Sequence, residues 1–278
     1  MIKQKNLPSV FWFDGATYFD LSFNLSSFGR DASVIPLETD DFIYFGLYKP
    51  FKALYTEISV ANVVSATLDL EYWNGSAWTN LSGIIEDTKA FSRAGFIQFD
   101  KPSDWAKTTV NGSEKFFIRM APSVNLTVGT SIQGMNIVFS DDQDLKGIYP
   151  AVSNYLGSTE TTFILRHENS RDLMVQELRN RAFQKKGNAR SYYESLEPWD
   201  ILEIDEVRMW SANLTMANIF SSLQANSNDL YSQKAEEFIE KAEYYKAAVF
   251  LTLDKDDDGV MDSVESASDI STRRLVRR

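Results

Sequence analysis

The feature that most constrains the fold is a change of pattern near the middle of the chain. Residues 67–73 alternate between apolar and acidic side chains, with Leu68 and Leu70 on one face and Asp69 on the other. Alternation with a period of two is typical of a half-buried strand. Asn74-Gly75 follows, and residues 77–81 return as a second apolar run. This combination predicts a β-hairpin.

The rest of the first half reads in the same way. It is rich in aromatic and β-branched residues broken by Asn, Gly, Pro and Ser, which is typical of strands and turns. Further strands are expected at Phe42–Tyr48, Ala53–Val60, Gly95–Phe99, Phe116–Met120 and Ile132–Phe139. We therefore expect residues 1–143 to form an antiparallel β-sandwich, Ig-like or jelly-roll-like.

The second half changes to helical spacing. A helix is expected from about Asn169, with Ser170 as its cap and Lys185-Lys186-Gly187-Asn188 as its stop. Its apolar stripe begins with Leu173, Val175 and Leu178. Glu197-Pro198-Trp199-Asp200 starts another element, followed by a helix face of Val207, Trp210, Leu214 and Ala217.

A third helix is expected over Asp229–Leu251, with one charged side and one apolar side. The apolar side comprises Leu230, Ala235, Phe238, Ala242, Tyr245 and Val249. Three such helices pack as a small bundle, which we assign to residues 144–253. The expected fold class is thus α+β and multidomain, with an N-terminal sandwich, a C-terminal bundle and a terminal segment, residues 254–278.

Composition excludes several kinds of chemistry. The chain has no cysteine and one histidine, His167, which excludes disulfides, thiolate metal sites and multi-histidine zinc sites. Its net charge of −11 argues against a general nucleic-acid binder. We see no run of apolar residues long enough for a membrane helix, and no secretory signal. The exception to the acidic balance is a basic tail of Arg273, Arg274, Arg277 and Arg278, which is either solvated or docked on an acidic partner.

One motif carries specific chemistry. Residues 254–265 match the twelve-residue calcium loop of the EF-hand at each diagnostic position. A hard cation needs six to eight oxygen ligands, and Gly259 supplies the sharp turn at the sixth position. The expected ligands are Asp254, Asp256, Asp258, the Val260 carbonyl, Asp262 and Glu265.

The loop predicts a structural calcium ion rather than a sensor. Sensor EF-hands work in pairs, and one loop is present. The residues after Glu265 are few and polar, so the loop is expected to be EF-hand-like and to hold the chain that follows the long helix.

No catalytic site is expected, and we interpret the chain as a non-enzyme. The carboxylates of Asp200, Glu203, Asp205 and Glu206 fall at a predicted helix start, where acidic residues favour the positive end of the dipole. His167 is interpreted as a surface or interface histidine. Trp73, Trp78 and Trp105 have the chemistry to stack on sugars, but alternation predicts that at least one of them is buried.

Part of the first half resembles a known module. The run Leu70–Leu81 is followed by Glu86-Asp87-Thr88, Gly95–Phe99, Pro102–Trp105 and Phe116–Arg119. This string is similar to the β-sandwich module common in structural proteins of tailed phages, over residues 50–140.

The second half resembles the helical head–tail connector, or adaptor, proteins of tailed phages. The residues that carry the resemblance are Leu202–Arg208, Ala212–Leu214, Leu230-Tyr231, Lys234–Glu236 and Tyr244-Tyr245, with the 254–265 loop after them. The resemblance implies a ring of about twelve copies at the neck of the virion, bound to the portal and to other neck or tail proteins. The N-terminal sandwich departs from minimal adaptors, which are mostly helical.

Our first interpretation is therefore a structural virion protein, made in the host cytoplasm, that joins portal to tail. The alternative is a carbohydrate- or receptor-binding tail component whose β-sandwich is the ligand-binding domain. A third possibility, a calcium-regulated interaction protein of a cell, would need a second calcium loop.

Overall fold

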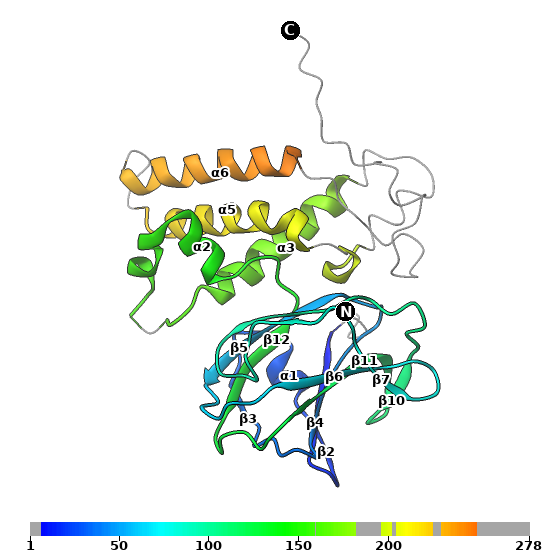
Figure 1. Cartoon of the computed structure of the whole chain (residues 1–278). Coiled ribbons are helices and arrows are strands. Elements are labelled where there is room, and N and C mark those ends of the chain that lie inside the picture. Colours follow the sequence, from blue (N-terminus) through cyan, green and yellow to red (C-terminus); the bar gives the residue numbers. More distant parts are fainter. Residues whose placement is uncertain (1–6, 159, 182–195, 202–203, 225–228, 249–278) are drawn as a thin grey trace. The chain divides into compact units, whose positions relative to one another are not determined.

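The structure is a computed structural model that describes residues 7–158, 160–181, 196–201, 204–224 and 229–248. The chain divides into two compact units, with the boundary between Ile137 and Val138. The first unit contains the strands and the second contains the longer helices (Figure 1). An α+β fold with N-terminal antiparallel sheets and C-terminal helices is therefore confirmed.

The first unit contains a seven-stranded antiparallel sheet. Six of its strands follow the order β2-β1-β4-β11-β6-β7, and β10 pairs with β11. Their bounds are β1 Ser9–Phe13, β2 Tyr18–Asp20, β4 Phe42–Leu47, β6 Leu68–Trp73, β7 Trp78–Asn80, β10 Thr108–Val110 and β11 Ser113–Pro122.

A five-stranded antiparallel sheet has the order β3-β12-β5-β9-β8. Its strands are β3 Ser33–Val34, β5 Ala53–Val60, β8 Ile85–Glu86, β9 Gly95–Gln98 and β12 Ser131–Asn136. A single helical turn, α1 Ser22–Leu25, lies near β12. Gly134 of β12 leaves room for Phe28, because a Cβ there would lie 2.5 Å from the ring.

The predicted strands are confirmed with small shifts at their ends. The hairpin expected at Asn74-Gly75 joins β6 to β7, and the side chain of Asn74 accepts hydrogen bonds from the backbone amides of Ser76 and Ala77. The strand expected at Ile132–Phe139 stops at Asn136. Five strands were not predicted from the sequence: β1, β2, β3, β8 and β10.

Aromatic rings dominate the core of the first unit. Phe51 meets Phe45 of β4 at 5.3 Å and Phe99, just after β9, at 5.7 Å. Trp105 packs 5.0 Å from Phe51 and donates from its indole nitrogen to the Phe117 carbonyl. Side chains in or just after strands of both sheets therefore contact one another.

A turn before β9 has an unusual backbone. Lys89, Ala90 and Phe91 all have positive φ, at 51°, 51° and 62°. The left-handed region costs an L-residue roughly 1–2 kcal/mol. Asn62 fixes the turn, since its backbone amide donates to the Phe91 carbonyl and its side-chain amide donates to the Ala90 carbonyl.

The second unit is helical. It consists of α2 Asp142–Ile148, α3 Ile164–Arg181, α5 Ile204–Ser222 and α6 Leu230–Ala248, with short 3-10 turns at Pro150–Tyr155 and Pro198–Asp200. α5 contacts α2, α3 and α6 and lies at the centre of the helices (Figure 1). Asp141 caps α2 by accepting from the amides of Gln143 and Asp144.

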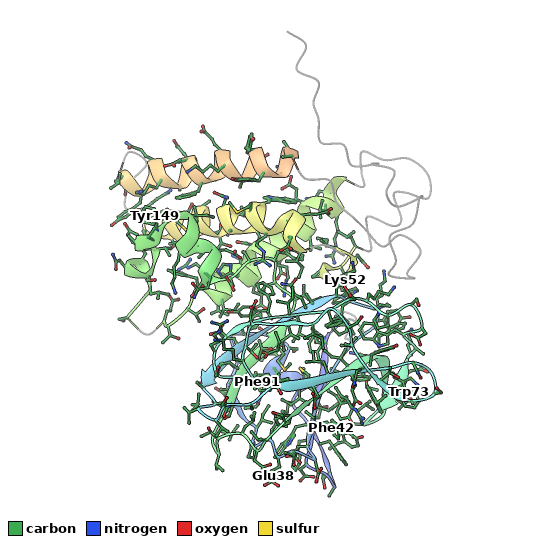
Figure 2. All side chains as sticks on the ribbon, viewed as in Figure 1. Glu38, Phe42, Lys52, Trp73, Phe91 and Tyr149 are labelled. Atoms are coloured by element: carbon green, nitrogen blue, oxygen red, sulfur yellow. The ribbon has the colours of Figure 1, made fainter. Side chains whose placement is uncertain are left out.

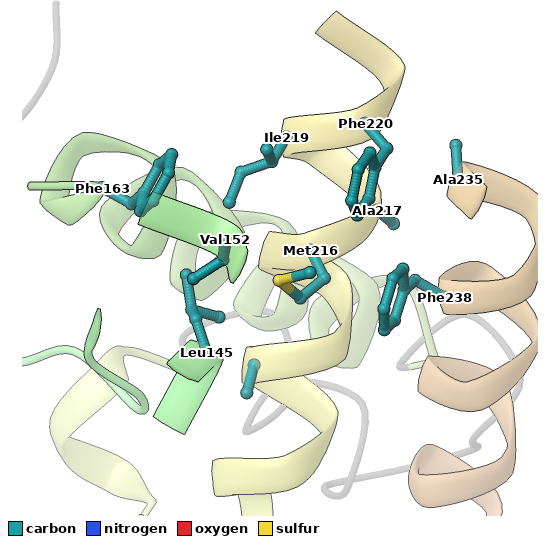
Figure 3. Packing of buried hydrophobic residues seen from close by; sticks show 10 residues of the cluster. Leu145, Val152, Phe163, Met216, Ala217, Ile219, Phe220, Ala235 and Phe238 are labelled. Carbon is teal, nitrogen blue, oxygen red and sulfur yellow. The ribbon is translucent and has the colours of Figure 1, made fainter. Parts of the chain in front are cut away.

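The apolar core of this unit is built around α5 (Figure 3). Met216, Ala217 and Phe220 of α5 meet Leu145 of α2 and Phe238 of α6. The rings of Phe220 and Phe238 stack almost in parallel, with centroids 5.6 Å apart. The predicted packing of three long helices is confirmed, and α2 adds to it.

Two details of the predicted helices are wrong. α3 begins at Ile164, so Ser170 is an interior residue and not a cap. Its buried hydroxyl instead accepts from Thr215 and Asn218 of α5, at 2.9 Å and 3.1 Å. Leu173 is exposed, and Met174 takes its place in the core.

The faces expected for the two later helices are confirmed in part. Val207, Trp210 and Ala217 are buried on α5, with Leu214 partly buried. On α6, Ala235, Phe238 and Ala242 are buried while Leu230 is exposed. Residues 185–188 and Val249 lie outside the described residues. No helix in the described part of the chain is long and apolar enough to cross a membrane.

Candidate functional site

One face of the seven-stranded sheet is lined with aromatic side chains. The strand register places Phe11, Tyr44, Arg119 and Glu71 in one row across four strands. Positions two residues away on the same strands add further rings to this face. We call it the aromatic face and define it by Phe11, Phe13, Tyr18, Phe42, Tyr44, Glu71, Trp73, Trp78, Phe117 and Arg119.

The rings of the aromatic face touch one another in a continuous series. Phe13 lies 4.7 Å from Tyr18, and Tyr18 lies 5.8 Å from Tyr44. Tyr44 meets Trp78 edge-on at 5.5 Å, and Trp78 meets Trp73 edge-on at 5.7 Å. Tilted and edge-on pairs at these distances each contribute roughly 0.5–1.5 kcal/mol beyond burial. The series therefore holds its rings in fixed positions.

Arg119 stands at the centre of the aromatic face. Its guanidinium carbon lies 4.2 Å from the ring centre of Phe42 and 4.7 Å from that of Trp78. Its Nε donates to Glu71 at 2.5 Å. Two rings and one carboxylate thus fix the orientation of the guanidinium, while 20% of the side chain stays exposed.

Tyr44 connects Arg119 of β11 to Tyr18 of β2, the strand at one end of the sheet. Burial raises the pKa of Tyr44 to about 12, although a hydrogen bond from Arg119 lowers it in part. A further hydrogen bond joins Tyr44 to Tyr18 of β2. The phenol therefore stays protonated across the physiological range and serves as a fixed dipole between the two groups.

A glycine makes this arrangement possible. Gly46 of β4 pairs with Phe117 of β11, and a Cβ on Gly46 would lie 2.3 Å from the Phe117 ring. The ring of Phe117 therefore occupies the space that any other residue at position 46 would fill. Phe11 and Tyr44 close over it at 6.0 Å and 6.5 Å.

The aromatic face remains partly open. Phe13, Phe42, Trp73 and Trp78 are half-buried, and Tyr18 is 38% exposed. Figure 2 shows Phe42 and Trp73 on the strand-rich unit. Open aromatic rings beside a fixed guanidinium–carboxylate pair can bind a ligand that has both apolar and hydrogen-bonding surfaces.

Lys115 lies further along β11, on the same side of the strand as Phe117. Burial lowers its pKa to about 8, and the charge of Asp20 opposes this in part. Its ammonium donates to the Leu7 carbonyl. Lys115 therefore ties the start of the described chain to β11.

A second polar cluster lies inside the helical unit. His167 of α3 is fully buried, and both of its ring nitrogens have partners. Nδ1 lies 2.9 Å from the Ser140 hydroxyl, and Nε2 lies 3.2 Å from Asp142 Oδ1. Ser140 also contacts the Ser211 hydroxyl at 2.8 Å.

The interpretation of His167 as a surface or interface residue is corrected, because its side chain is fully buried inside the helical unit. Its neighbours in sequence, Arg166 and Glu168, suggested exposure, but its ring contacts Ser140 and Asp142, and Ser140 in turn contacts Ser211 of α5. Serine, histidine and aspartate come together as in a hydrolase triad, yet Ser140 is fully buried and is held by two partners. The cluster satisfies buried polar groups and fixes α3 against α5.

The acidic cluster behaves as a helix start. Asp205 and Glu206 lie in the first turn of α5, as expected. Asp200 is buried and accepts from the Glu197 amide at 2.7 Å. Glu203 lies outside the described residues.

The predicted calcium ligands, Asp254 to Glu265, and the basic tail also lie outside the described residues. Within the described ranges, no group of three or more His, Asp or Glu side chains is placed to hold a metal ion. The predicted burial of at least one tryptophan is confirmed, because Trp105 lies in the core. Trp73 and Trp78 belong to the aromatic face.

No family model matches the chain, and no curated protein matches it. Among solved structures, a similar chain is CpGH89CBM32-6 produced by Clostridium perfringens. The match has 14% sequence identity and a TM-score of 0.30, and it covers 49% of this chain and 94% of that one.

Proposed function

We propose that this protein is a structural subunit of a tailed-phage virion, a head–tail connector that forms a ring at the neck and binds the portal. The observation that carries the proposal is the build of the helical unit. α5 is enclosed by its neighbours, while α3 and α6 present large apolar side chains to solvent. These are Leu165 and Leu173 on α3, and Leu230, Ile239 and Tyr244 on α6.

Exposed apolar groups on a rigid helical body support lateral contact with a second copy. Tyr244 is 70% exposed and Leu230 is 61% exposed. Large exposed apolar groups commonly mark association surfaces. The resemblance of residues 202–245 to connector proteins supports the same arrangement, in which each copy contacts the next around the ring.

The chemistry of the described residues also supports a scaffold rather than an enzyme. The single imidazole is used inside the helical core, where it contacts Ser140 and Asp142. Its role there is to stabilise the packing of α3 on α5.

The proposal includes two finer points of architecture. We infer that the two sheets of the first unit form a β-sandwich, which the shared core of Phe45, Phe51 and Phe99 supports. We also infer that residues 254–265 bind a structural calcium ion. The long helix that should precede such a loop is present as α6, which runs to Ala248.

Native mass spectrometry and electron microscopy of the purified chain test the ring. We expect about twelve copies per particle, and a shift toward monomers when Ile239 and Tyr244 are both changed to Glu. Val128→Glu is the matched control, because Val128 is 88% exposed but belongs to the strand-rich unit. A chain that stays monomeric at high concentration, or that forms a trimer, contradicts the proposal.

Electron microscopy of the virion tests the location. Antibody against this chain should label the neck of the particle. Label on tail fibres would instead favour the receptor-binding alternative.

A further inference from the structure

We propose that the aromatic face is a binding site for a neutral oligosaccharide that runs across the strands of the seven-stranded sheet. Tyr18, Phe42, Trp78 and Trp73 supply stacking surfaces, and Arg119 and Glu71 supply hydrogen bonds at the centre. This inference goes beyond the proposed role in assembly. Either can fail while the other stands.

Open aromatic rings supply the apolar contacts of the site. Tyr18, Phe42, Trp73 and Trp78 contact one another or shared neighbours, but none is closed off from solvent. A pyranose presents one apolar face of C–H groups, and an aromatic ring fixed in place stacks on such a face without losing side-chain freedom.

Arg119 supplies the polar contacts of the site. A guanidinium has five N–H donors. One is used by Glu71, and another is used by Tyr44. The group is held between two rings, so its remaining donors have a fixed direction. A sugar hydroxyl can accept a hydrogen bond from Arg119 and donate one to Glu71, because the two side chains are held side by side.

Charge selects the class of ligand. Arg119 and Glu71 neutralise each other at 2.5 Å, so the centre of the site has no excess charge. On the same face the charge of Lys115 on β11 is opposed by that of Asp20 on β2, Asp69 on β6 adds one further negative charge, and the whole chain carries a net charge of −11. A phosphate, a nucleic acid or an acidic glycan would be repelled.

The strand order sets the direction of the ligand. Tyr18 belongs to β2 and Trp78 to β7, which are the two ends of the strand order. Their rings converge over the middle of the sheet, because Tyr18 lies 5.8 Å from Tyr44 and Tyr44 lies 5.5 Å from Trp78, so the Tyr18 and Trp78 ring centres are at most about 11 Å apart and Trp73 lies 5.7 Å beyond Trp78. This length suits a short oligosaccharide of two or three sugar rings.

A proline-rich peptide is the main competing occupant, because such peptides also dock on aromatic grooves. The paired Arg119 and Glu71, with exposed Asn80 and Asp69 in line with Glu71, favour a ligand with hydroxyls along its length.

The test uses the full chain on an array of neutral oligosaccharides, followed by titration calorimetry with cellohexaose, laminarihexaose and chitohexaose. We expect binding to at least one neutral glycan, and an affinity at least tenfold lower for Trp78→Ala. Tyr18→Ala is a second variant, which removes the stacking ring at the other end of the site, and circular dichroism of both variants checks that they are folded. Glu71→Gln keeps the shape of the site and should weaken binding by removing the charged acceptor.

The matched control is Phe23→Ala. Phe23 is 74% exposed and has its own arginine, Arg30, at 4.0 Å from the ring centre, but it belongs to α1 and not to the strands that form the aromatic face. This variant should bind as the wild type does. The proposal is overturned if the full chain binds no neutral glycan, if binding survives both Trp78→Ala and Tyr18→Ala, or if Phe23→Ala loses it equally. Competition by a proline-rich peptide without glycan binding would assign the face to a peptide.

Discussion

Replacing Gly46 with alanine tests the packing beneath the aromatic face. The added methyl group would lie 2.3 Å from Cε1 and 2.4 Å from Cδ1 of the Phe117 ring. These separations are far below a normal carbon–carbon contact of 3.5–4.0 Å. Either the ring or the strand must therefore move by more than an ångström.

Neither can move freely. Phe117 is fully buried, and Phe11 and Tyr44 press on its ring. β4 is held between β1 and β11. Overpacking of this kind costs about 1–3 kcal/mol. For a unit of this size, each kcal/mol lowers the melting temperature by about 4 °C.

Differential scanning calorimetry and urea titration measure the effect. The matched control is Gly147→Ala in α2, where a Cβ meets nothing within 4 Å and the backbone is helical. That change should stabilise the chain by about 0.5–1 kcal/mol. In a double-mutant cycle, adding Phe117→Leu should recover part of the loss caused by Gly46→Ala. If Gly46→Ala is as harmless as Gly147→Ala, Phe117 does not lie over Gly46 and the account of the aromatic face is wrong.

Three further predictions concern other parts of the chain. Lys89→Asn should raise stability by about 0.5–1 kcal/mol, because Asn tolerates positive φ better than Lys; an unchanged urea midpoint would contradict the strained turn. Burial alone would raise the pKa of Asp142, but hydrogen bonds from His167 and the Phe163 amide hold it below its ordinary value. A carboxyl whose pKa is lower in the folded state stabilises the fold above its unfolded pKa, and this stabilisation is lost as the pH falls. Asp142→Asn should therefore lower the free energy of unfolding at pH 7 and lower it progressively less below about pH 4. An equal loss at pH 7 and below pH 4 would refute this. EDTA should lower the melting temperature of the full chain and added calcium should restore it, with Glu265→Gln insensitive to both; a melt unaffected by EDTA would exclude a bound structural calcium.

Local signals in the sequence were sufficient for the β6–β7 hairpin and for seven of the twelve strands of the first unit. Asn74-Gly75 flanked by alternating residues specifies a turn through short-range chemistry. β1 was harder to predict because Ser9–Phe13 has large apolar side chains on both faces, so no alternation is visible. Its aromatic side is satisfied by neighbours from β2 and β4, which are not visible in a local pattern.

The residues of the candidate site also divide into those that a local sequence pattern reveals and those that only tertiary contacts define. Trp73 and Trp78 could be identified from the sequence as possible stacking residues. Arg119 could not, because its partner Glu71 lies 48 residues away and the two meet only through the register of β11 with β6. Ser170 and His167 were also misread, since tertiary contacts with α5 and with Ser140 and Asp142 override their local preference for caps and surfaces.

The central position of α5 sets the order in which the helical unit can open. α6 packs along α5, and Lys246 reaches Glu177 of α3 at 2.8 Å. A helix enclosed on several sides exposes its amides only after a neighbour has left, so deuterium should enter α6 before α5. The outermost helix can therefore adapt to whatever it meets while the middle of the unit keeps its shape.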